Sequence, residues 1–351
     1  MFNRSFHILT TFLFSSFLLA WSPIEVDIWN PPFNKNQSHS KDKYIALEKA
    51  KKKWRICVSI PHLKDAYWLA VNYGLVEHAK SLGVSLNIYS AGGYDKLDQQ
   101  RKQLQNCLTE KYDAVIIGAI QSDGLDDLIQ SFHEKKIPVI DLINGISSPL
   151  ISARTAADFF EMGKEAGKYT VNNFSQKKTL KIAWFPGPKG AGWAEAGDKG
   201  FRSAFKGKNF KILESAYGDT GLGVQTKMIH KAFQDHPDID IIAGTAVSAE
   251  AGIQELRRRK LTSKVKIISY YFSPAVHRGI QKKAITVSPS DVPGHQARLS
   301  VDIAVKALEK LPFPKHLSAS IQMIDFSNIN KIDLSGSLAP EGFRGIFSVN
   351  N

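Results

Sequence analysis

The sequence alternates between short apolar runs and amphipathic stretches, and this alternation constrains the fold more than any other feature. Apolar runs rich in β-branched residues occupy 54–60, 84–90, 113–119 and 137–143, and stretches with helical periodicity separate them at 66–82, 95–110 and 122–135. Successive runs begin roughly 30 residues apart, which is the length of one strand–helix–strand unit. Apolar strands separated by helices predict an α/β fold with a parallel sheet covered on both faces.

The same alternation starts again in the second half of the chain. Predicted strands lie at 180–186, 210–216, 239–244, 265–272, 284–288 and 320–326, and predicted helices at 158–172, 193–206, 222–235, 247–258, 273–282 and 294–310. A single hydrophobic core rarely grows beyond about 250–300 residues. We therefore predict two doubly wound lobes with a cleft between them.

The first 52 residues do not follow this alternation. Residues 1–20 have Arg4 before a short apolar core and end at the small residue Ala20, which is typical of a secretory signal peptide. The apolar core is shorter than the about 20 residues that a spanning helix needs, and an uncleaved N-terminal anchor is the alternative. Residues 21–52 are polar, and we predict a leader that drapes over the protein or is disordered.

The formal net charge of +13 raises the question of nucleic-acid binding. The basic residues are dispersed, however, apart from two short runs at 49–53 and 257–260. The second run follows a helical pattern, where cations favour the C-terminal end. We interpret both runs as solvated surface, and an exported protein meets no genome. A basic face remains suited to an acidic protein partner or a membrane surface.

The two cysteines, Cys57 and Cys107, fall in the same predicted lobe. An oxidising compartment permits a disulfide, and a bridge between these positions is sterically possible. A pair of buried thiols is the alternative.

The sequence contains none of the patterns that would indicate catalysis. The glycine-rich segment 187–192 lacks the Gly-Lys-Ser/Thr ending of a phosphate-binding loop, so we predict a tight ligand-facing turn there. The ten histidines are scattered without the spacing of a metal site, and no Gly-x-Ser-x-Gly elbow occurs. We therefore predict a binding protein without a metal or cofactor rather than an enzyme.

Aromatic side chains recur where the predicted strands end. Tyr67 and Trp68 follow the first strand, and Tyr94 follows the second. In an open α/β fold the carboxyl ends of the strands border the ligand crevice, so we expect these rings to meet there. Rings outnumber charged groups, which suits a methylated ammonium better than a sugar. Further candidate ligand contacts at strand ends, helix starts and lobe crossings are Asp65, Gln121, Ser122, Phe159, Trp193, Tyr271 and Asp291.

Two of these assignments have alternatives. Asp65 directly precedes a predicted helix, where it would serve as the N-cap. Neighbouring residues of a strand point to opposite faces, so one of Tyr270 and Tyr271 is expected to lie in the core.

The order of the elements resembles the type I periplasmic binding protein fold, whose chain crosses between two lobes three times. The resemblance implies a three-stranded hinge, with crossings near 144–148, 288–291 and 311–318. It also implies that residues 53–146 and 291–312 form an N-terminal lobe. Residues 147–290 and 318–351 would form a C-terminal lobe.

Several motifs between residues 53 and 347 are more specific than the element order. They include Asp65-Ala66-Tyr67-Trp68, Ala91-Gly92-Gly93-Tyr94, His236-Pro237-Asp238-Ile239-Asp240 and Gly342-Phe343-Arg344. Together they resemble the TorT family of periplasmic sensors for trimethylamine N-oxide (TMAO). The resemblance implies a periplasmic protein that binds TMAO or a similar small methylated compound. It also implies a partner, the periplasmic domain of a TorS-like hybrid histidine kinase.

The resemblance carries an aromatic-rich ligand site onto Tyr67, Trp68 and Tyr94, whose surrounding motifs match. Where the family often has Trp, this chain has Phe159, which keeps a ring face but lacks the indole N–H. The oxide oxygen needs donors, and the candidates are the Trp68 indole, a tyrosine hydroxyl, Gln121 and Ser122. The alternative function is that of a solute-binding protein of an ABC importer for sugars or related solutes.

Overall fold

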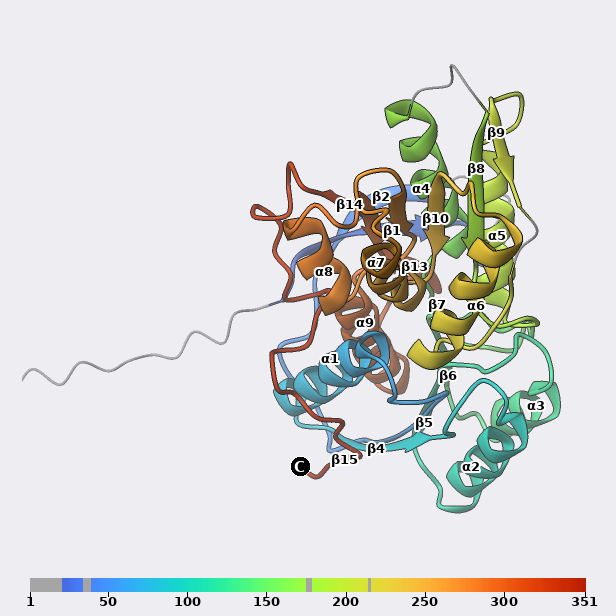
Figure 1. The fold of residues 1–351 in the computed structure, drawn as a ribbon. Helices are drawn as coiled ribbons and strands as arrows, with labels where there is room; N and C mark the ends of the chain where they lie inside the picture. The colour runs from blue at the N-terminus through green and yellow to red at the C-terminus, as the bar shows by residue number, and fades with distance from the viewer. Residues whose placement is uncertain (1–20, 34–38, 175–178, 214–215) are drawn as a thin grey trace, which may run out of the picture.

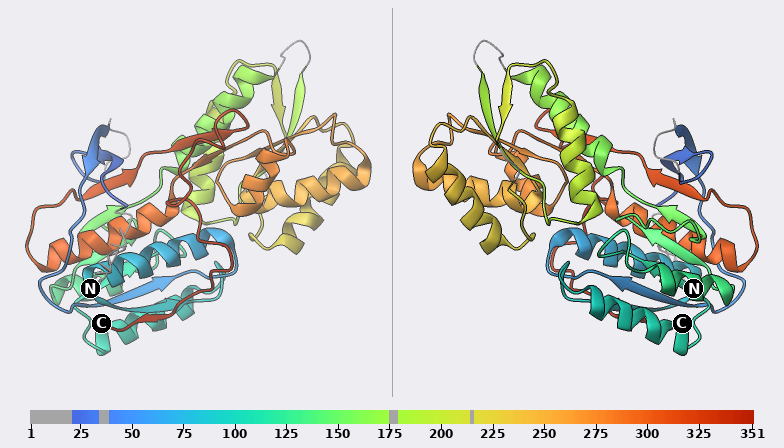
Figure 2. Two further views of the ribbon diagram at one scale, coloured as in Figure 1. Left: turned by 90° about the vertical axis from the view of Figure 1, so that its left-hand side faces the viewer. Right: turned by 90° about the vertical axis from the view of Figure 1, so that its right-hand side faces the viewer.

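The computed structural model describes residues 21–33, 39–174, 179–213 and 216–351. They form two α/β lobes, each built on its own sheet (Figure 1). Lobe A contains the nine-stranded sheet, and lobe B contains the six-stranded sheet. Figure 2 shows the two lobes side by side. The predicted fold class, α/β with two doubly wound and mainly parallel sheets, is confirmed.

The sheet of lobe A has the strand order β15-β4-β3-β5-β6-β7-β13-β1-β2. The strands from β4 to β13 in this order are parallel to their neighbours, whereas β15, β1 and β2 pair antiparallel. Their bounds are β1 (Ile24–Trp29), β2 (His39–Tyr44), β3 (Arg55–Ile60), β4 (Ser85–Ser90), β5 (Ala114–Ile117), β6 (Val139–Leu142), β7 (Ala153–Thr155), β13 (His316–Ala319) and β15 (Ser348–Val349).

Helices cover both faces of this sheet. α1 (Ala66–Leu82) packs against α9 (Pro293–Leu308) on one face, and α2 (Leu97–Thr109) packs with α3 (Asp126–Glu134) on the other. The first helix has defined ends, because the Asp65 carboxylate accepts a hydrogen bond from the Trp68 N–H at 3.0 Å and Gly83 ends the helix in the left-handed conformation. The N-cap alternative for Asp65 is therefore confirmed.

The sheet of lobe B has the order β14-β12-β11-β10-β8-β9, and only β14 pairs antiparallel. Its strands are β8 (Leu180–Phe185), β9 (Phe210–Ile212), β10 (Ile241–Gly244), β11 (Lys266–Ser269), β12 (Val287–Ser290) and β14 (Gln322–Asp325). On one face α4 packs against α5, and on the other α7 packs against α6 and α8. Their bounds are α4 (Phe159–Asn173), α5 (Gly192–Ser203), α6 (Leu222–Asp235), α7 (Ala246–Arg259) and α8 (Pro274–Gln281).

The predicted lobe boundaries need correction. The chain leaves lobe A after β7 rather than near 144–148, because the short strand Ala153–Thr155 still pairs with β6. It returns after β12, as predicted, and crosses again between β13 and β14, a few residues later than predicted. A fourth crossing was not predicted: the tail 326–347 runs back from lobe B, and β15 joins the sheet of lobe A (Figure 2).

The prediction of a draping or disordered leader at 21–52 is wrong for the described part of that segment. β1 and β2 form an antiparallel hairpin, and β1 pairs with β13 next to the crossing into lobe B. The sequence Ile24-Glu25-Val26-Asp27-Ile28 alternates apolar and acidic residues, as a half-buried strand does. The Trp29 ring stacks on His316 of β13, with ring centroids 4.4 Å apart. The predicted signal peptide, residues 1–20, lies outside the described residues.

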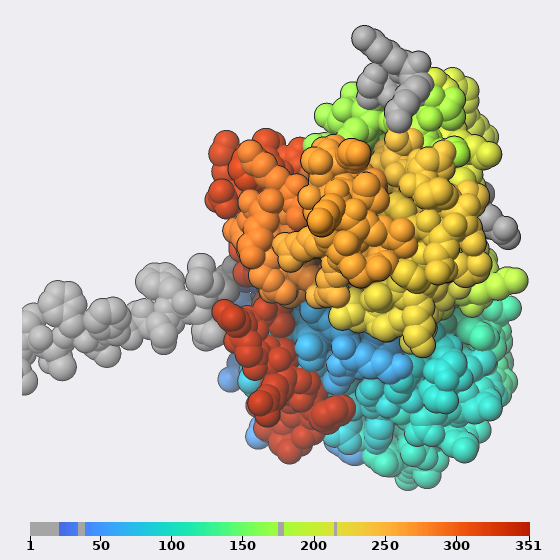
Figure 3. Space-filling model, viewed as in Figure 1, coloured from blue at the N-terminus to red at the C-terminus, as the bar shows by residue number. Residues whose placement is uncertain are grey.

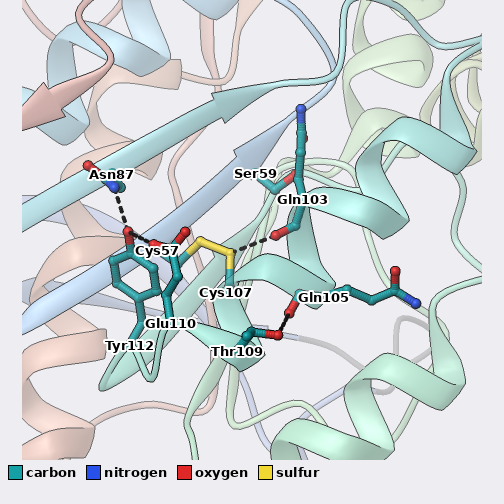
Figure 4. Close-up of a disulfide and its surroundings, with 9 residues drawn as sticks. All are labelled: Cys57, Ser59, Asn87, Gln103, Gln105, Cys107, Thr109, Glu110 and Tyr112. Carbon is teal, nitrogen blue, oxygen red and sulfur yellow. Dashed lines mark hydrogen bonds between the residues drawn. A yellow bond between two sulfur atoms is a disulfide. The ribbon is translucent and has the colours of Figure 1, made fainter.

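A disulfide joins Cys57 of β3 to Cys107 of α2 (Figure 4). Their Cα atoms lie 6.0 Å apart, and both side chains are fully buried. Of the two predicted alternatives, the structure therefore contains the disulfide and not a pair of buried thiols. It ties α2 to the face of the sheet opposite α1.

None of the helices that the structure describes has the length and apolar character needed to cross a membrane.

Candidate functional site

Six aromatic rings converge where the carboxyl ends of the two sheets face each other. Lobe A contributes Tyr67 and Trp68 from the start of α1 and Tyr94 from the loop after β4. Lobe B contributes rings from the start of α4, the start of α5 and the end of β11, namely Phe159, Trp193 and Tyr271. We call these six rings the aromatic cage. All six were predicted from the sequence, and the structure brings them together.

The rings of the two lobes lie in direct contact. Tyr67 and Tyr271 meet edge to face with centroids 5.5 Å apart, and Tyr94 and Trp193 lie 5.9 Å apart. Trp193 also lies against Phe159, at 5.6 Å. On the face shown in Figure 3, the atoms of the two lobes meet along one seam.

The cage encloses a small cavity. The centre of a water-sized sphere can move through about 20 Å³ of it. Among the described residues, three polar ones line it besides the rings: Asp65, Asn144 and Thr220. The walls are therefore mainly apolar, with a few polar groups, as in most small-molecule sites.

Sequence reasoning missed Asn144 and Thr220. Asn144 follows strand β6 at the same sheet edge as the predicted residues, so the rule that found Tyr94 would have found it. Thr220 lies in the turn before α6, four residues after the end of the predicted strand 210–216, which is the same spacing as for Tyr94. The structure brings its side chain to the cavity.

Three predicted contacts lie outside the cavity lining. Gln121 is exposed and Ser122 is half-buried, and neither lines the cavity. Asp291 is fully buried behind the cage, where one carboxylate oxygen accepts a hydrogen bond from the Tyr67 hydroxyl at 2.5 Å. It therefore positions a ring rather than lining the cavity. Of the two neighbouring tyrosines, Tyr271 lines the cavity, whereas Tyr270 is buried and donates to the Pro186 carbonyl.

The Tyr94 hydroxyl is oriented by two donors. Its oxygen accepts from the Trp68 indole N–H at 3.4 Å and from the Asn144 amide at 3.2 Å. Burial raises the pKa of Tyr94, so the phenol keeps its proton. Among the described residues no acceptor for that proton is found. The Tyr94 O–H is therefore a donor available to a ligand, whereas the Trp68 N–H, a predicted donor, is already engaged.

A second donor is available beside it. The Trp193 indole N–H is buried and makes no hydrogen bond of good geometry, although it lies near the Tyr94 hydroxyl. Because a buried N–H without a partner costs about 1–3 kcal/mol, an acceptor in the cavity would relieve that cost. Two adjacent donors on a wall of rings form a site for one small acceptor atom.

Burial shifts the pKa of two ionisable groups at or beside the cage. It raises the pKa of the Asp65 carboxyl and lowers the pKa of the neighbouring His62 imidazole. Both shifts favour the uncharged forms, because a charged group is poorly solvated in a buried position.

Asp291 gives a pH-dependent prediction for stability. Burial raises its pKa to about 6, so the folded protein holds this proton in a range where an unfolded carboxyl, with a pKa of 3.8, has lost it. The stability that the raised pKa of Asp291 contributes is therefore fully present below pH 3.8, and it is lost as the pH rises through about 6. With 1.36 kcal/mol per pKa unit, ionisation costs up to about 3 kcal/mol above pH 6. The difference in free energy of unfolding between Asp291→Asn and wild type should therefore shift in favour of Asp291→Asn by about 3 kcal/mol as the pH rises from 4 to 7.5.

Urea unfolding of both proteins at several pH values measures this difference. Asp123→Asn is the control, because that carboxylate is exposed. A stability difference between wild type and Asp291→Asn that does not change with pH would contradict the prediction.

Two α/β lobes with a small ring-lined cavity between them define the class of two-lobed solute-binding proteins. Residues 56–312 match the sequence model of the periplasmic binding protein domain, and the chain belongs to this family. Its members bind or sense small molecules rather than catalyse reactions, and membership indicates a periplasmic location.

Within this family the chain is TorT-like. It is 33% identical over 299 residues to the periplasmic protein TorT of Escherichia coli K12, which covers 85% of this chain and 86% of that protein. A crystal structure of the TorS sensor domain–TorT complex in the presence of TMAO matches with a TM-score of 0.77 at 31% identity, over 84% of this chain and 99% of the matched chain.

A second solved structure is also similar over nearly the whole chain. It is an ABC transporter solute-binding protein from Bradyrhizobium sp. BTAi1 with bound bis-tris. The two chains are 45% identical with a TM-score of 0.83, and the match covers 93% of this chain and 98% of that one.

Proposed function

We propose that this protein binds TMAO, or a closely similar small methylated oxide, in the aromatic cage and signals its presence to a TorS-like hybrid histidine kinase. The observation that carries the proposal is the cage itself. It combines six rings with two available donors, Tyr94 O–H and Trp193 N–H, around one small cavity.

The rings suit the methylated end of the ligand. A methylated nitrogen with a formal positive charge cannot donate an N–H hydrogen bond, but ring faces attract it by about 0.5–2 kcal/mol per ring. The contacts between Trp193 and the rings of Tyr94, Phe159 and Tyr271 place several aromatic surfaces around one point.

The donors suit the oxygen end. The oxide oxygen carries the negative end of the dipole and accepts hydrogen bonds only. The Tyr94 O–H and the Trp193 N–H are two adjacent donors available beside the cavity. This pair distinguishes an N-oxide or sulfoxide from the corresponding amine or sulfide, which lacks the oxygen.

The size of the ligand limits the affinity. TMAO has five non-hydrogen atoms, and a ceiling of about 1.5 kcal/mol per atom gives a binding free energy of at most about 7.5 kcal/mol. That corresponds to roughly micromolar binding at best. Such an affinity suits a sensor of an external electron acceptor.

A second candidate function is that of the solute-binding protein of an ABC importer. The similarity to the Bradyrhizobium protein favours it. Bis-tris is a tertiary amine with hydroxyl arms, so the cage chemistry agrees with either function. A sugar is disfavoured, because in the described part of the chain Asp65, Asn144 and Thr220 alone add polar side-chain groups to the rings of the lining. A kinase gene beside this one would favour the sensor, and permease and ATPase genes the importer.

Titration calorimetry with TMAO, dimethyl sulfoxide, trimethylamine and D-ribose tests the ligand. We expect micromolar or weaker binding of TMAO and at least about tenfold weaker binding of trimethylamine, because a hydrogen bond to a charged group contributes about 1.5–3 kcal/mol. D-ribose is expected to give no heat. Binding of D-ribose without binding of TMAO would refute the ligand assignment and favour the importer.

A further inference from the structure

A groove on the surface of lobe B has a lining that the ligand site does not explain. It lies between α7 and α8 and has a volume of about 170 Å³. Ile253, Ala275, Gly279 and Ala284 give it an apolar floor. Three cationic side chains, Arg257, Arg278 and Lys282, line it together with a single carboxylate, Glu250.

The three cations of the groove differ from their neighbours in having no ion-pair partner. Arg258 and Arg259, next along α7, pair with Glu255 at 2.7 Å and 2.5 Å. Within the part of the chain that the structure describes, Arg257, Arg278 and Lys282 form no ion pair. All three side chains are exposed.

Helix-end electrostatics explains only part of this arrangement. Arg257, Arg278 and Lys282 all lie in the last turn or at the C-cap of their helices, where a cation gains a little from the helix dipole. That effect acts on each helix by itself. It does not account for cations from two helices meeting over one apolar floor, where they repel each other.

The groove also continues toward the ligand site. A neighbouring hollow of about 280 Å³ shares Glu250, Ala275 and Arg278 with the groove and reaches Tyr67 and Tyr271 of the cage. This hollow is lined by both lobes, with Lys64 on the lobe A side and the exposed Leu222 on the lobe B side. Anything seated in the groove therefore lies close to the seam between the two lobes.

We propose that the groove between α7 and α8 is a docking surface for an acidic, partly apolar segment of a partner protein. Carboxylates would pair with the three free cations, and apolar side chains would cover the floor, which a small inorganic anion would leave exposed. The identity of the partner, the sensor domain of the kinase, rests on the proposed function. The docking surface itself does not. The position beside the seam would let such a partner detect closure of the lobes.

Fluorescence anisotropy with a labelled peptide of four Glu-Leu repeats tests the surface directly. The groove variant carries Arg257→Glu, Arg278→Glu and Lys282→Glu. The matched control carries Lys102→Glu, Lys111→Glu and Lys135→Glu, three exposed lysines of lobe A without an ion pair among the described residues. Both variants change the net charge equally. Circular dichroism melting of each confirms that it is folded.

We expect saturable peptide binding to the wild-type chain, about tenfold weaker binding to the groove variant and less than a threefold change in the control. Equal weakening in both variants would show that only net charge matters and would overturn the proposal, as would no saturable binding to wild type. TMAO calorimetry on the same proteins separates the two claims. If TMAO does not bind but the peptide still distinguishes the variants, the ligand assignment fails and the docking surface stands.

Discussion

Replacing Trp193 by alanine is expected to weaken TMAO binding by about 100-fold or more. Trp193 contacts three other cage rings, and its N–H is an available donor beside the Tyr94 hydroxyl. Losing a ring face costs about 0.5–2 kcal/mol, and losing a hydrogen bond to a charged oxygen costs about 1.5–3 kcal/mol. Since 1.4 kcal/mol is tenfold in affinity, the sum amounts to about two orders of magnitude or more. Calorimetry on the folded variant measures the loss.

Two milder variants separate the contributions. Trp193→Phe keeps a ring and removes the N–H, and Tyr94→Phe removes only the hydroxyl. Each should cost about tenfold, the value of one donor. They also guard against misinterpretation, because truncating a buried Trp to Ala destabilises a protein by about 3–5 kcal/mol.

Trp184→Phe is the matched control for this series. It too removes a buried indole N–H, which donates to Asp198 at 2.7 Å, but Trp184 does not line the cavity. TMAO binding should stay within threefold of wild type. If Trp193→Ala binds TMAO as tightly as Trp184→Phe, the cage is not the ligand site.

Replacing Asp302 by alanine is expected to lower the free energy of unfolding by about 3–5 kcal/mol, as breaking a buried ion pair does. The fully buried Asp302 carboxylate on α9 accepts from the Tyr44 hydroxyl at 2.6 Å and the Leu47 N–H at 2.9 Å. It also lies 2.9 Å from the His78 imidazole and 3.1 Å from the Lys306 ammonium. Alanine would leave all four groups without this partner.

The charge of Asp302 is maintained by these neighbours. Burial acts to raise the pKa of Asp302, but the hydrogen bonds and charges of His78, Tyr44 and Lys306 outweigh it, and the net pKa is lowered. A lowered pKa contributes stability above pH 3.8 that is lost as the pH falls. The stability difference between wild type and Asp302→Ala should therefore shrink in acid.

Urea unfolding at pH 7 and pH 3 measures both effects, and limited proteolysis of the β1–β2 hairpin reports whether it has detached. Asp42→Ala on β2 is the control. Asp42 is exposed, and its carboxylate accepts from the adjacent Lys43 N–H, so a change within about 0.5 kcal/mol is expected. A loss below 1 kcal/mol for Asp302→Ala would show that the network does not stabilise the chain.

Much of the aromatic cage could be predicted, because one local rule covers it. Tyr67, Trp68 and Tyr94 follow strands, and parallel strands bring their carboxyl ends to one edge. The same rule placed Gln121 and Ser122 too close to the cavity. It marks the edge of the sheet but not how far each loop extends beyond it.

Two short parallel strands of the lobe A sheet, β7 and β13, escaped prediction for a different reason. β7 and β13 are short, and β7 carries Arg154 in a buried strand. Hydropathy alone disfavours such a strand. The structure tolerates it because Asp141 of β6 accepts from the Arg154 guanidinium at 2.6 Å. An ion pair between residues on separate strands leaves no pattern in the sequence around either residue.

The sequence by itself determined the two-lobed α/β architecture, the helices and central strands, and the ring-rich character of the cleft, because each follows from periodicities of a few residues. Only the tertiary structure decided that β1 and β2 extend the sheet of lobe A and that the tail crosses back to it. It also decided that Asp291 lies behind Tyr67. The physical reason is that partners distant in the sequence set these features. Whether the Tyr94 or Trp68 donor is free for a ligand depends on which neighbours the fold supplies.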